Sequence, residues 1–164
     1  MVQIVLLHLG CKPVRRVVTF VATGAYAGYS PIAPGTAGTL VGILLFVLLS
    51  SLDIIYIYSF TVLGILVLAC FVSGRAEQIL GQRDSPHIVI DEVLGYLVTM
   101  FQFSATWRNI FLGFLLFRFF DIAKPFPIRL IQLRLSGGYG VVLDDVMAGI
   151  YANLSQRIIL HFWH

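Results

Sequence analysis

Residues 36–73 read TAGTLVGILLFVLLSSLDIIYIYSFTVLGILVLACFVS, and Asp53 is the only charged residue among them. The apolar runs on its two sides, Thr36–Leu52 and Ile54–Ser73, are each about long enough to cross a hydrocarbon layer of ~30 Å as a helix. Because the polar break between the runs is so short, the stretch predicts a hairpin of two membrane helices.

The composition of the whole chain also indicates that the protein lies in a lipid bilayer. Of its 164 residues 59% are apolar and 12% are charged, with a mean hydropathy of +0.92. Soluble domains carry roughly 25% charged residues, and one core of this size could not bury so much apolar surface. We therefore expect a single membrane-embedded domain over residues 1–164, with no particular oligomeric state indicated.

The net charge of +3 raises the question of an acidic partner. The basic residues do not form a polar face with interleaved aromatics, so a nucleic-acid partner is not expected. Anionic lipid head groups are the simpler partner for them.

Three later stretches are apolar but less clean: Val93–Phe103, Asn109–Phe117 and Val146–Trp163. The first two are short, and they predict either a second hairpin whose helices extend beyond the hydrocarbon or a re-entrant pair. The third predicts a final span. The predicted fold class is thus an all-α, polytopic membrane bundle of about four to five membrane helices.

This topology places residues 1–35, 74–92 and 121–145 on one side of the membrane. Basic residues gather in these segments, whereas Arg108 is the one that lies in an opposite loop. The gathered residues are Lys12, Arg15, Arg16, Arg75, Arg83, Lys124, Arg129 and Arg134. Since loops rich in Lys and Arg stay inside, this side is predicted to be cytoplasmic.

All acidic residues except Asp53 fall on the same predicted side. Asp91–Glu92 are predicted to open the third helix, Asp121 to close the fourth, and Asp144–Asp145 to open the fifth. Carboxylates gathered at one depth repel one another unless a cation or protons intervene, and such oxygen ligands suit Mg²⁺. The alternative is that they complement helix dipoles, for roughly 0.3–1 kcal/mol each.

Two cations flank Asp121 at helical spacing. Arg118 and Lys124 lie three residues before and after it. They either hold phosphate oxygens, or Arg118 forms an ion pair with Asp121 while Lys124 extends to the surface. The prolines that follow predict that this helix ends by Ala123.

Glycines mark places of close approach. Gly95 follows Asp91 by one helical turn, and Gly149 follows Asp145 in the same way, which predicts that other backbones approach these helix faces. The Gly- and Pro-rich residues 23–39 precede the first span. Such a loop can present backbone N–H groups and the start of a helix to an anion.

Four motifs occur in a fixed order along the chain: SPxxPGTxGT at residues 30–39, Asp84 with IVxDExxG at 88–95, FRxFDxxKPxPI at 117–128, and GGxGxxxDDxxAG at 137–149. Together they resemble the phosphatidylglycerophosphatase A family of bacterial membrane lipid phosphatases. The resemblance covers about residues 23–152 and leaves 1–22 as an N-terminal segment.

The resemblance implies an all-helical, multi-pass protein of the bacterial inner (cytoplasmic) membrane with its active site on the cytoplasmic side. The implied reaction is the Mg²⁺-dependent dephosphorylation of phosphatidylglycerophosphate to phosphatidylglycerol. The implied catalytic residues are Asp84, Asp91, Glu92, Asp121, Lys124 and Asp145. The implied metal ligands are Asp91, Glu92, Asp121, Asp144 and Asp145. Phosphate is expected to meet Ser30, Thr36, Thr39, Arg118 and Lys124.

The gathered carboxylates are also compatible with two other functions. A small cation transporter or channel would use the carboxylates for selectivity, but it needs them along a pore rather than at one face. A phospholipid head-group transferase is also Mg²⁺-dependent, but its Asp-Gly-x₂-Ala-Arg…Asp-x₃-Asp spacing is absent from the chain.

Overall fold

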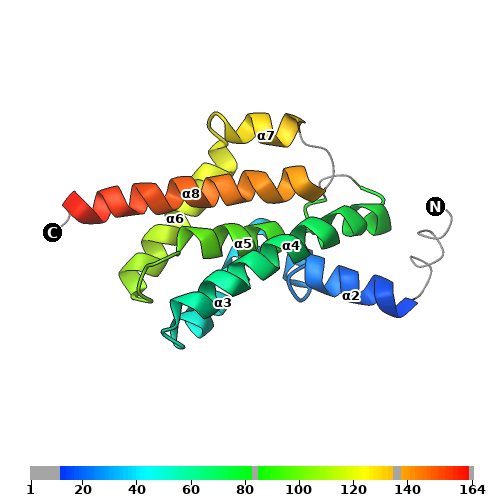
Figure 1. Cartoon of the computed structure of the whole chain (residues 1–164). Helices are drawn as coiled ribbons and strands as arrows, with labels where there is room; N and C mark the ends of the chain where they lie inside the picture. The colour runs from blue at the N-terminus through cyan, green and yellow to red at the C-terminus, as the bar shows by residue number, and fades with distance from the viewer. Residues whose placement is uncertain (1–11, 83–84, 135–137, 163–164) are drawn as a thin grey trace.

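The computed structural model describes residues 12–82, 85–134 and 138–162, and within these ranges it contains helices and loops alone. This confirms the all-α prediction. The elements are α2 (Lys12–Ala22), the 3₁₀ turn η1 (Ala27–Tyr29), α3 (Pro34–Ser50), α4 (Ile55–Leu80), α5 (Ile90–Thr99), α6 (Trp107–Ala123), α7 (Ile128–Arg134) and α8 (Gly138–Phe162) (Figure 1).

The predicted hairpin is formed by α3 and α4, which are joined by a short turn at Asp53. Its φ of 49° is the left-handed conformation that Asp tolerates better than most residues. The second helix runs past Ser73 to Leu80, because Arg75 and Glu77 end the apolar run but favour helix. Gly81, at a φ of 69°, then ends the helix.

Of the helices that the structure describes, α4 is the one long and apolar enough to cross a membrane. Its 26 residues reach about 39 Å. By contrast, α3 is apolar but has 17 residues, and the 10 residues of α5 reach only about 15 Å. The structure therefore supports one candidate span, and the predicted four to five spans are not established by helix length.

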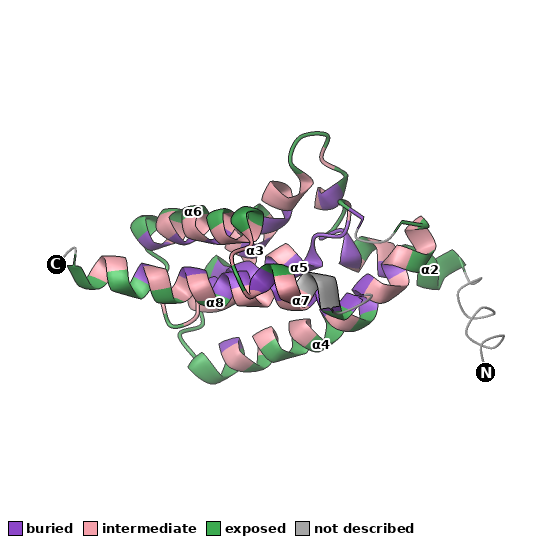
Figure 2. Cartoon of the chain, turned by 90° about the horizontal axis from the view of Figure 1, so that it is seen from above, coloured by how far each residue is buried: buried purple, intermediate pink, exposed green. Residues whose placement is uncertain are grey.

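The centre of the molecule is the short helix α5. It contacts α3, α4, α6 and α8, and Leu94, Tyr96 and Leu97 on it are fully buried. Figure 2 shows buried residues along α5 and exposed residues along the outward sides of α4 and α6. The predicted stretch Val93–Phe103 is thus an enclosed helix that starts at Ile90 and stops at Thr99.

Glycines allow the neighbouring helices to approach α5. A Cβ atom on Gly42 of α3 would lie 3.2 Å from the carbonyl oxygen of Val93, and one on Gly149 of α8 would meet the backbone of Gly95. The prediction of close packing at Gly95 and Gly149 is therefore confirmed. Gly38, one turn before Gly42, meets Val89 just before α5 begins.

Helix α8 begins earlier than the sequence pattern predicts. The sequence predicts that Asp144–Asp145 open this helix, but Gly138 is already helical and packs on α4. A Cβ at this position would collide with the backbone of Cys70 and Gly74. This tertiary contact outweighs the weak helix propensity of glycine, so Asp145 lies in the second turn of α8 and does not open it.

Candidate metal and phosphate site

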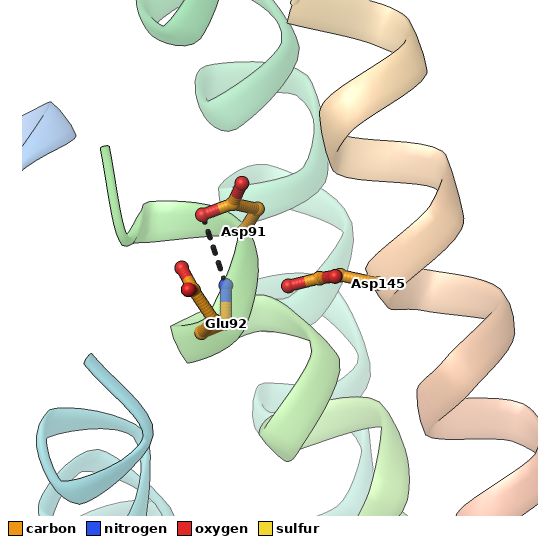
Figure 3. A group of neighbouring side chains, drawn as sticks. All are labelled: Asp91, Glu92 and Asp145. Atoms are coloured by element: carbon orange, nitrogen blue, oxygen red, sulfur yellow. Dashed lines mark hydrogen bonds between the residues drawn. The ribbon is translucent and has the colours of Figure 1, made fainter. Parts of the chain in front are cut away.

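Three carboxylates meet where α5 and α8 pack together. Asp91 and Glu92 come from the first turn of α5 and Asp145 from α8, and one oxygen of each lies within 4.8 Å of the others. Figure 3 shows the three side chains converging from the two helices. Asp91 and Asp145 are each 4% exposed, and Asp91 accepts a hydrogen bond of 3.1 Å from the backbone N–H of Glu92.

The glycine contact between the two helices explains this convergence. A Cβ on Gly95 would lie 2.8 Å from the carbonyl oxygen of Asp145 and 2.5 Å from the Phe117 ring. Without side chains at Gly95 and Gly149, the helices approach closely one turn beyond the carboxylates. The Asp91 and Asp145 side chains are therefore close enough for one oxygen of each to lie within 4.8 Å of the other.

These residues fit a hard divalent cation. Asp91 and Asp145 are buried and Glu92 is half-buried, and one oxygen of Glu92, Oε2, is buried without a hydrogen-bond partner in the described part of the chain. Negative charges on these three groups would repel one another unless a cation or protons lay between them. Ligands of an octahedral Mg²⁺ ion, at about 2.1 Å each, stand about 3.0 Å apart when adjacent and about 4.2 Å apart when opposite. Oxygens that stand up to 4.8 Å apart must therefore move inward by up to about 2 Å to bind one ion together.

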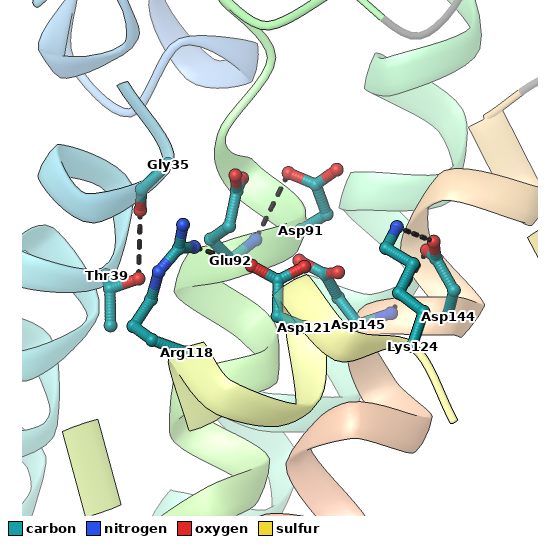
Figure 4. Close-up of polar contacts among 9 residues, drawn as sticks. All are labelled: Gly35, Thr39, Asp91, Glu92, Arg118, Asp121, Lys124, Asp144 and Asp145. Atoms are coloured by element: carbon teal, nitrogen blue, oxygen red, sulfur yellow. Dashed lines mark hydrogen bonds and ion pairs between the residues drawn. The ribbon is translucent and has the colours of Figure 1, made fainter. Parts of the chain in front are cut away.

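Two ion pairs border the carboxylates (Figure 4). Arg118 Nη1 lies 2.6 Å from Asp121 Oδ2, as one of the two sequence interpretations predicted. Lys124 does not extend to the surface as that interpretation also required. Its Nζ lies 2.5 Å from Oδ2 of the buried Asp144.

The conformation and charge state of Lys124 follow from its position at the end of α6. Its backbone caps the helix at a φ of 40°. Burial by itself lowers the pKa of Lys124, but the hydrogen bond to Asp144 and the charges of Asp144, Asp145 and Asp121 outweigh this effect and raise it. Lys124 therefore remains a cation at neutral pH.

All five carboxylates that were expected to bind metal lie in this region (Figure 4). Asp121 is close enough to Asp145 and Glu92 to interact with them electrostatically. Asp121 and Asp144 are engaged by cations, so a metal-binding role for these two stays a prediction. Asp84 lies outside the described residues, and its catalytic role likewise stays a prediction.

The first turn of α3 forms another wall of the site. A Cβ on Gly35 would lie 2.5 Å from Glu92 Oε1 and 3.1 Å from Arg118 Nη1, so only a glycine leaves both side chains in place. Ala33 caps α3 without any side-chain hydrogen bond. The unpaired N–H groups at a helix start attract anions, and here they lie beside Arg118.

The hydroxyls predicted to meet phosphate are less clearly placed for it. Ser30 Oγ donates to the carbonyl of Ile32, and Thr39 Oγ1 donates to the carbonyl of Gly35, both at 2.9 Å. Thr36 lies in the first turn of α3. The phosphate-binding roles of these three residues stay predictions. Gly35 belongs to one of the four sequence motifs, but its contact with Glu92 and Arg118 was not predicted.

Comparison with known proteins adds an independent line of evidence. The profile of the family described as Phosphatidylglycerophosphatase A matches residues 20–160. The chain belongs to this family. The resemblance noted from the sequence motifs is thereby confirmed, and so is the prediction of a phosphatase that acts on a lipid phosphate monoester.

Individual members of the phosphatidylglycerophosphatase A family resemble the chain over most of its length. It is 38% identical to phosphatidylglycerophosphatase A of Haemophilus influenzae, over 82% of this chain and 83% of that protein. It is 32% identical to phosphatidylglycerophosphatase A of Escherichia coli, over 87% of this chain and 83% of that protein. A Bacteroides thetaiotaomicron protein, named as a proposed phosphatidylinositol-3-phosphatase, is 33% identical over 80% of this chain and 86% of that protein. No solved structure matches the chain.

Proposed function

We propose that the protein removes the terminal phosphate from phosphatidylglycerophosphate and thereby forms phosphatidylglycerol, in a Mg²⁺-dependent reaction of phospholipid synthesis. The observation that carries the proposal is the convergence of Asp91, Glu92 and Asp145 in a chain of this family. The names of the Haemophilus and Escherichia relatives support the choice of substrate.

In this proposal Asp91, Glu92 and Asp145 hold the cation, with Asp121 and Asp144 as further candidate ligands. A bound Mg²⁺ supplies Lewis-acid chemistry and neutralises negative charge on a phosphoryl group. Arg118 and the first N–H groups of α3 are placed to bind the phosphoryl oxygens beside Glu92. Lys124 adds positive charge on the side of Asp144 and keeps its proton at neutral pH. Asp84 completes the proposed catalytic set.

The outer surface supports a multi-pass placement in the bacterial inner membrane. Large apolar side chains are exposed at intervals of three or four residues along α4, including Tyr56, Phe60, Leu63, Val67 and Phe71. Similar rows follow α3, α6 and α8. Exposed apolar surface this extensive is typical of protein–protein or membrane contacts, and we propose that lipid surrounds these four helices around the enclosed α5.

The proposal is tested with purified protein in detergent, phosphatidylglycerophosphate as substrate, and release of inorganic phosphate with and without Mg²⁺. Loss of a residue that only supports a metal ligand lowers activity by about 10–100-fold. Asp91→Asn and Asp145→Asn should each reduce the rate by more than this, because they remove proposed ligands. Asp53→Asn, at the opposite end of α4, is the matched control and should keep full activity.

A second readout does not depend on catalysis. A cation that binds only the folded state stabilises it by about 2.7 kcal/mol when its concentration is 100 times its Kd. Mg²⁺ should therefore raise the unfolding temperature of the wild type and of Asp53→Asn. It should not raise that of Asp145→Asn. Full Mg²⁺-dependent phosphate release by Asp91→Asn or Asp145→Asn would overturn the assignment. Faster release from phosphatidylinositol 3-phosphate would overturn the substrate.

A further inference from the structure

Helix α2, which the sequence motifs do not cover, has three distinct faces. Val18 and Ala22 are buried against α4 and the start of α5. Val17 and Phe20 expose 62% and 48% of their surface. The third face is cationic, and its residues recur at intervals of three or four along the helix: Lys12, Arg15, Arg16 and Thr19.

The cationic face borders a hollow of about 390 Å³. The hollow is lined by Lys12, Arg15, Arg16, Thr19 and Tyr26. Among the described residues, none of its three cations forms an ion pair. Arg15 donates a long hydrogen bond, 3.4 Å, to the carbonyl of Ile79 near the end of α4. The hollow therefore presents positive charge that no described carboxylate neutralises, and it suits an anionic group.

A row of aromatic rings continues from the hollow. The Phe20 and Tyr26 rings are 5.4 Å apart, the Tyr26 and Tyr29 rings 6.2 Å, and Tyr29 stacks on His87 at 4.7 Å. Phe20, Tyr26 and Tyr29 are about half exposed. Aromatic side chains with a polar edge collect where hydrocarbon meets water, so the row marks the level of the lipid head groups.

The hollow lies at the same end of the molecule as the carboxylates. Val18 and Ala22 share a hydrophobic cluster with Ile88 and Ile90, which lead into Asp91. Figure 2 shows α2 extending from this end, away from the body of the bundle. By the charge asymmetry of the loops, this end faces the cytoplasm.

We propose that the cationic hollow and the aromatic row bind the head group of an anionic phospholipid of the cytoplasmic leaflet, at a site separate from the carboxylate cluster. The cations would hold the lipid phosphate, and the rings would contact the glycerol and the first carbons of the tails. The inference uses the membrane placement proposed above and does not depend on the phosphatase reaction.

The test compares binding of short-chain phosphatidylserine and phosphatidylcholine to the full chain in neutral detergent. Both lipids are phosphodiesters, so neither is a substrate for a phosphomonoesterase, and failure here is distinct from failure of the proposed function. Lys12→Gln combined with Arg16→Gln removes two cations of α2 and preserves the hydrogen bond from Arg15 to α4. About 30-fold weaker phosphatidylserine binding is expected, together with a steep loss of wild-type binding at high salt.

Arg108→Gln combined with Arg129→Gln removes the same charge from exposed positions elsewhere and should leave binding unchanged. Lys12→Arg combined with Arg16→Lys preserves both charges and should bind phosphatidylserine as the wild type does. All variants should unfold at the wild-type temperature. Equal phosphatidylserine binding by the Lys12→Gln, Arg16→Gln protein would overturn the proposal. Phosphatidylcholine binding as tight as that of phosphatidylserine would overturn it as well. Displacement of phosphatidylserine by equimolar glycerol 3-phosphate would show a water-soluble occupant instead.

Discussion

At the start of α3, one missing methyl group keeps the helix in contact with the candidate site. Gly35→Ala would place a Cβ 2.5 Å from Glu92 Oε1 and close to the Arg118 guanidinium. Because both are ends of flexible side chains, they can move aside at little cost in stability. We expect a loss of phosphate release of at least about 10-fold, since a displacement of about 1 Å in an active site costs up to 100-fold.

Gly64→Ala is the matched control for Gly35→Ala, because a Cβ on Gly64 of α4 meets no atom within 4 Å. Each substitution should preserve or raise the unfolding temperature, since alanine favours helix over glycine by up to about 1 kcal/mol. Full activity in Gly35→Ala would show that the first turn of α3 does not shape the site. Unfolding temperature and phosphate release measured on the same preparations separate the two effects.

The Lys124–Asp144 ion pair predicts a pH dependence of stability. Lys124→Met should reduce the free energy of unfolding by about 1.5–3 kcal/mol, the range for hydrogen bonds to charged groups. Because the pKa of Lys124 is raised, this stabilisation is complete below the ordinary lysine pKa and is lost only as pH rises through the raised value. Unfolding in detergent should therefore show a constant difference from wild type at neutral pH that shrinks in strong alkali.

Arg129→Met, on an exposed part of α7, provides the control for Lys124→Met and should change the free energy of unfolding by less than about 0.5 kcal/mol. A difference between wild type and Lys124→Met that shrank already at neutral pH would contradict the raised pKa. Lys124→Arg should retain most of the stability, because it preserves the charge.

At single positions, the residue types indicated the kind of chemistry, but they did not indicate which side chains pair with one another. Asp91, Glu92 and Asp145 were among the five carboxylates expected from the sequence to gather at one side, together with Asp121 and Asp144, but the sequence did not specify which of the five converge most closely. The pairing of Lys124 with Asp144 was not predicted. It joins residues twenty positions apart on different elements, and no local pattern specifies such a contact.

Between elements, the crossing of α5 and α8 should be sensitive to one methyl group. In Gly149→Ala the new Cβ would collide with the backbone of Gly95 and approach Val98 Cβ to 3.1 Å. Backbone atoms cannot rotate aside as side chains do, so the helices must separate. We expect a loss of about 1–3 kcal/mol in the free energy of unfolding.

Separation of α5 from α8 would also move Asp145 away from Asp91, so Gly149→Ala should lose its Mg²⁺-dependent rise in unfolding temperature. The open position at Gly64 again provides a control, since its alanine variant should keep that rise. Retention of both stability and the response to Mg²⁺ in Gly149→Ala would show that the glycine contact does not position the carboxylates.

The limits of a helix could be predicted where an apolar run defines them. They were predicted poorly where contacts with other helices define them. The α3–α4 hairpin follows directly from two uncharged runs around Asp53. The end of α4 at Leu80 was missed because Arg75 and Glu77 interrupt hydropathy without interrupting helix. The start of α8 was missed because Gly138 is helical only through its contact with α4. Helix α2 was missed because its basic residues break the apolar pattern.

For the molecule as a whole, the charge asymmetry predicts which end faces the cytoplasm. In a chain whose two cysteines, Cys11 and Cys70, are replaced by serine, single reporters Ile32→Cys and Ser51→Cys sit near opposite ends of α3. A membrane-impermeant maleimide should label Ser51→Cys in intact cells and Ile32→Cys only after lysis. Labelling of Ile32→Cys in intact cells would contradict the orientation, and equal labelling of both would contradict a crossing by α3.

The close contact of Gly149 with Gly95 is also the point about which any rotation of α8 against α5 would occur. Asp91 and Asp145 precede these glycines by four residues each, so their backbones lie on lever arms of about 6 Å from the crossing point. A rotation of α8 by about 10° over such an arm would displace Asp145 relative to Asp91 by about 1 Å, and the far end of α8 by several times more. Because a displacement of about 1 Å in an active site costs up to 100-fold in rate, even a small rotation of α8 about this crossing would be felt at the site, so the function we propose needs a rigid crossing.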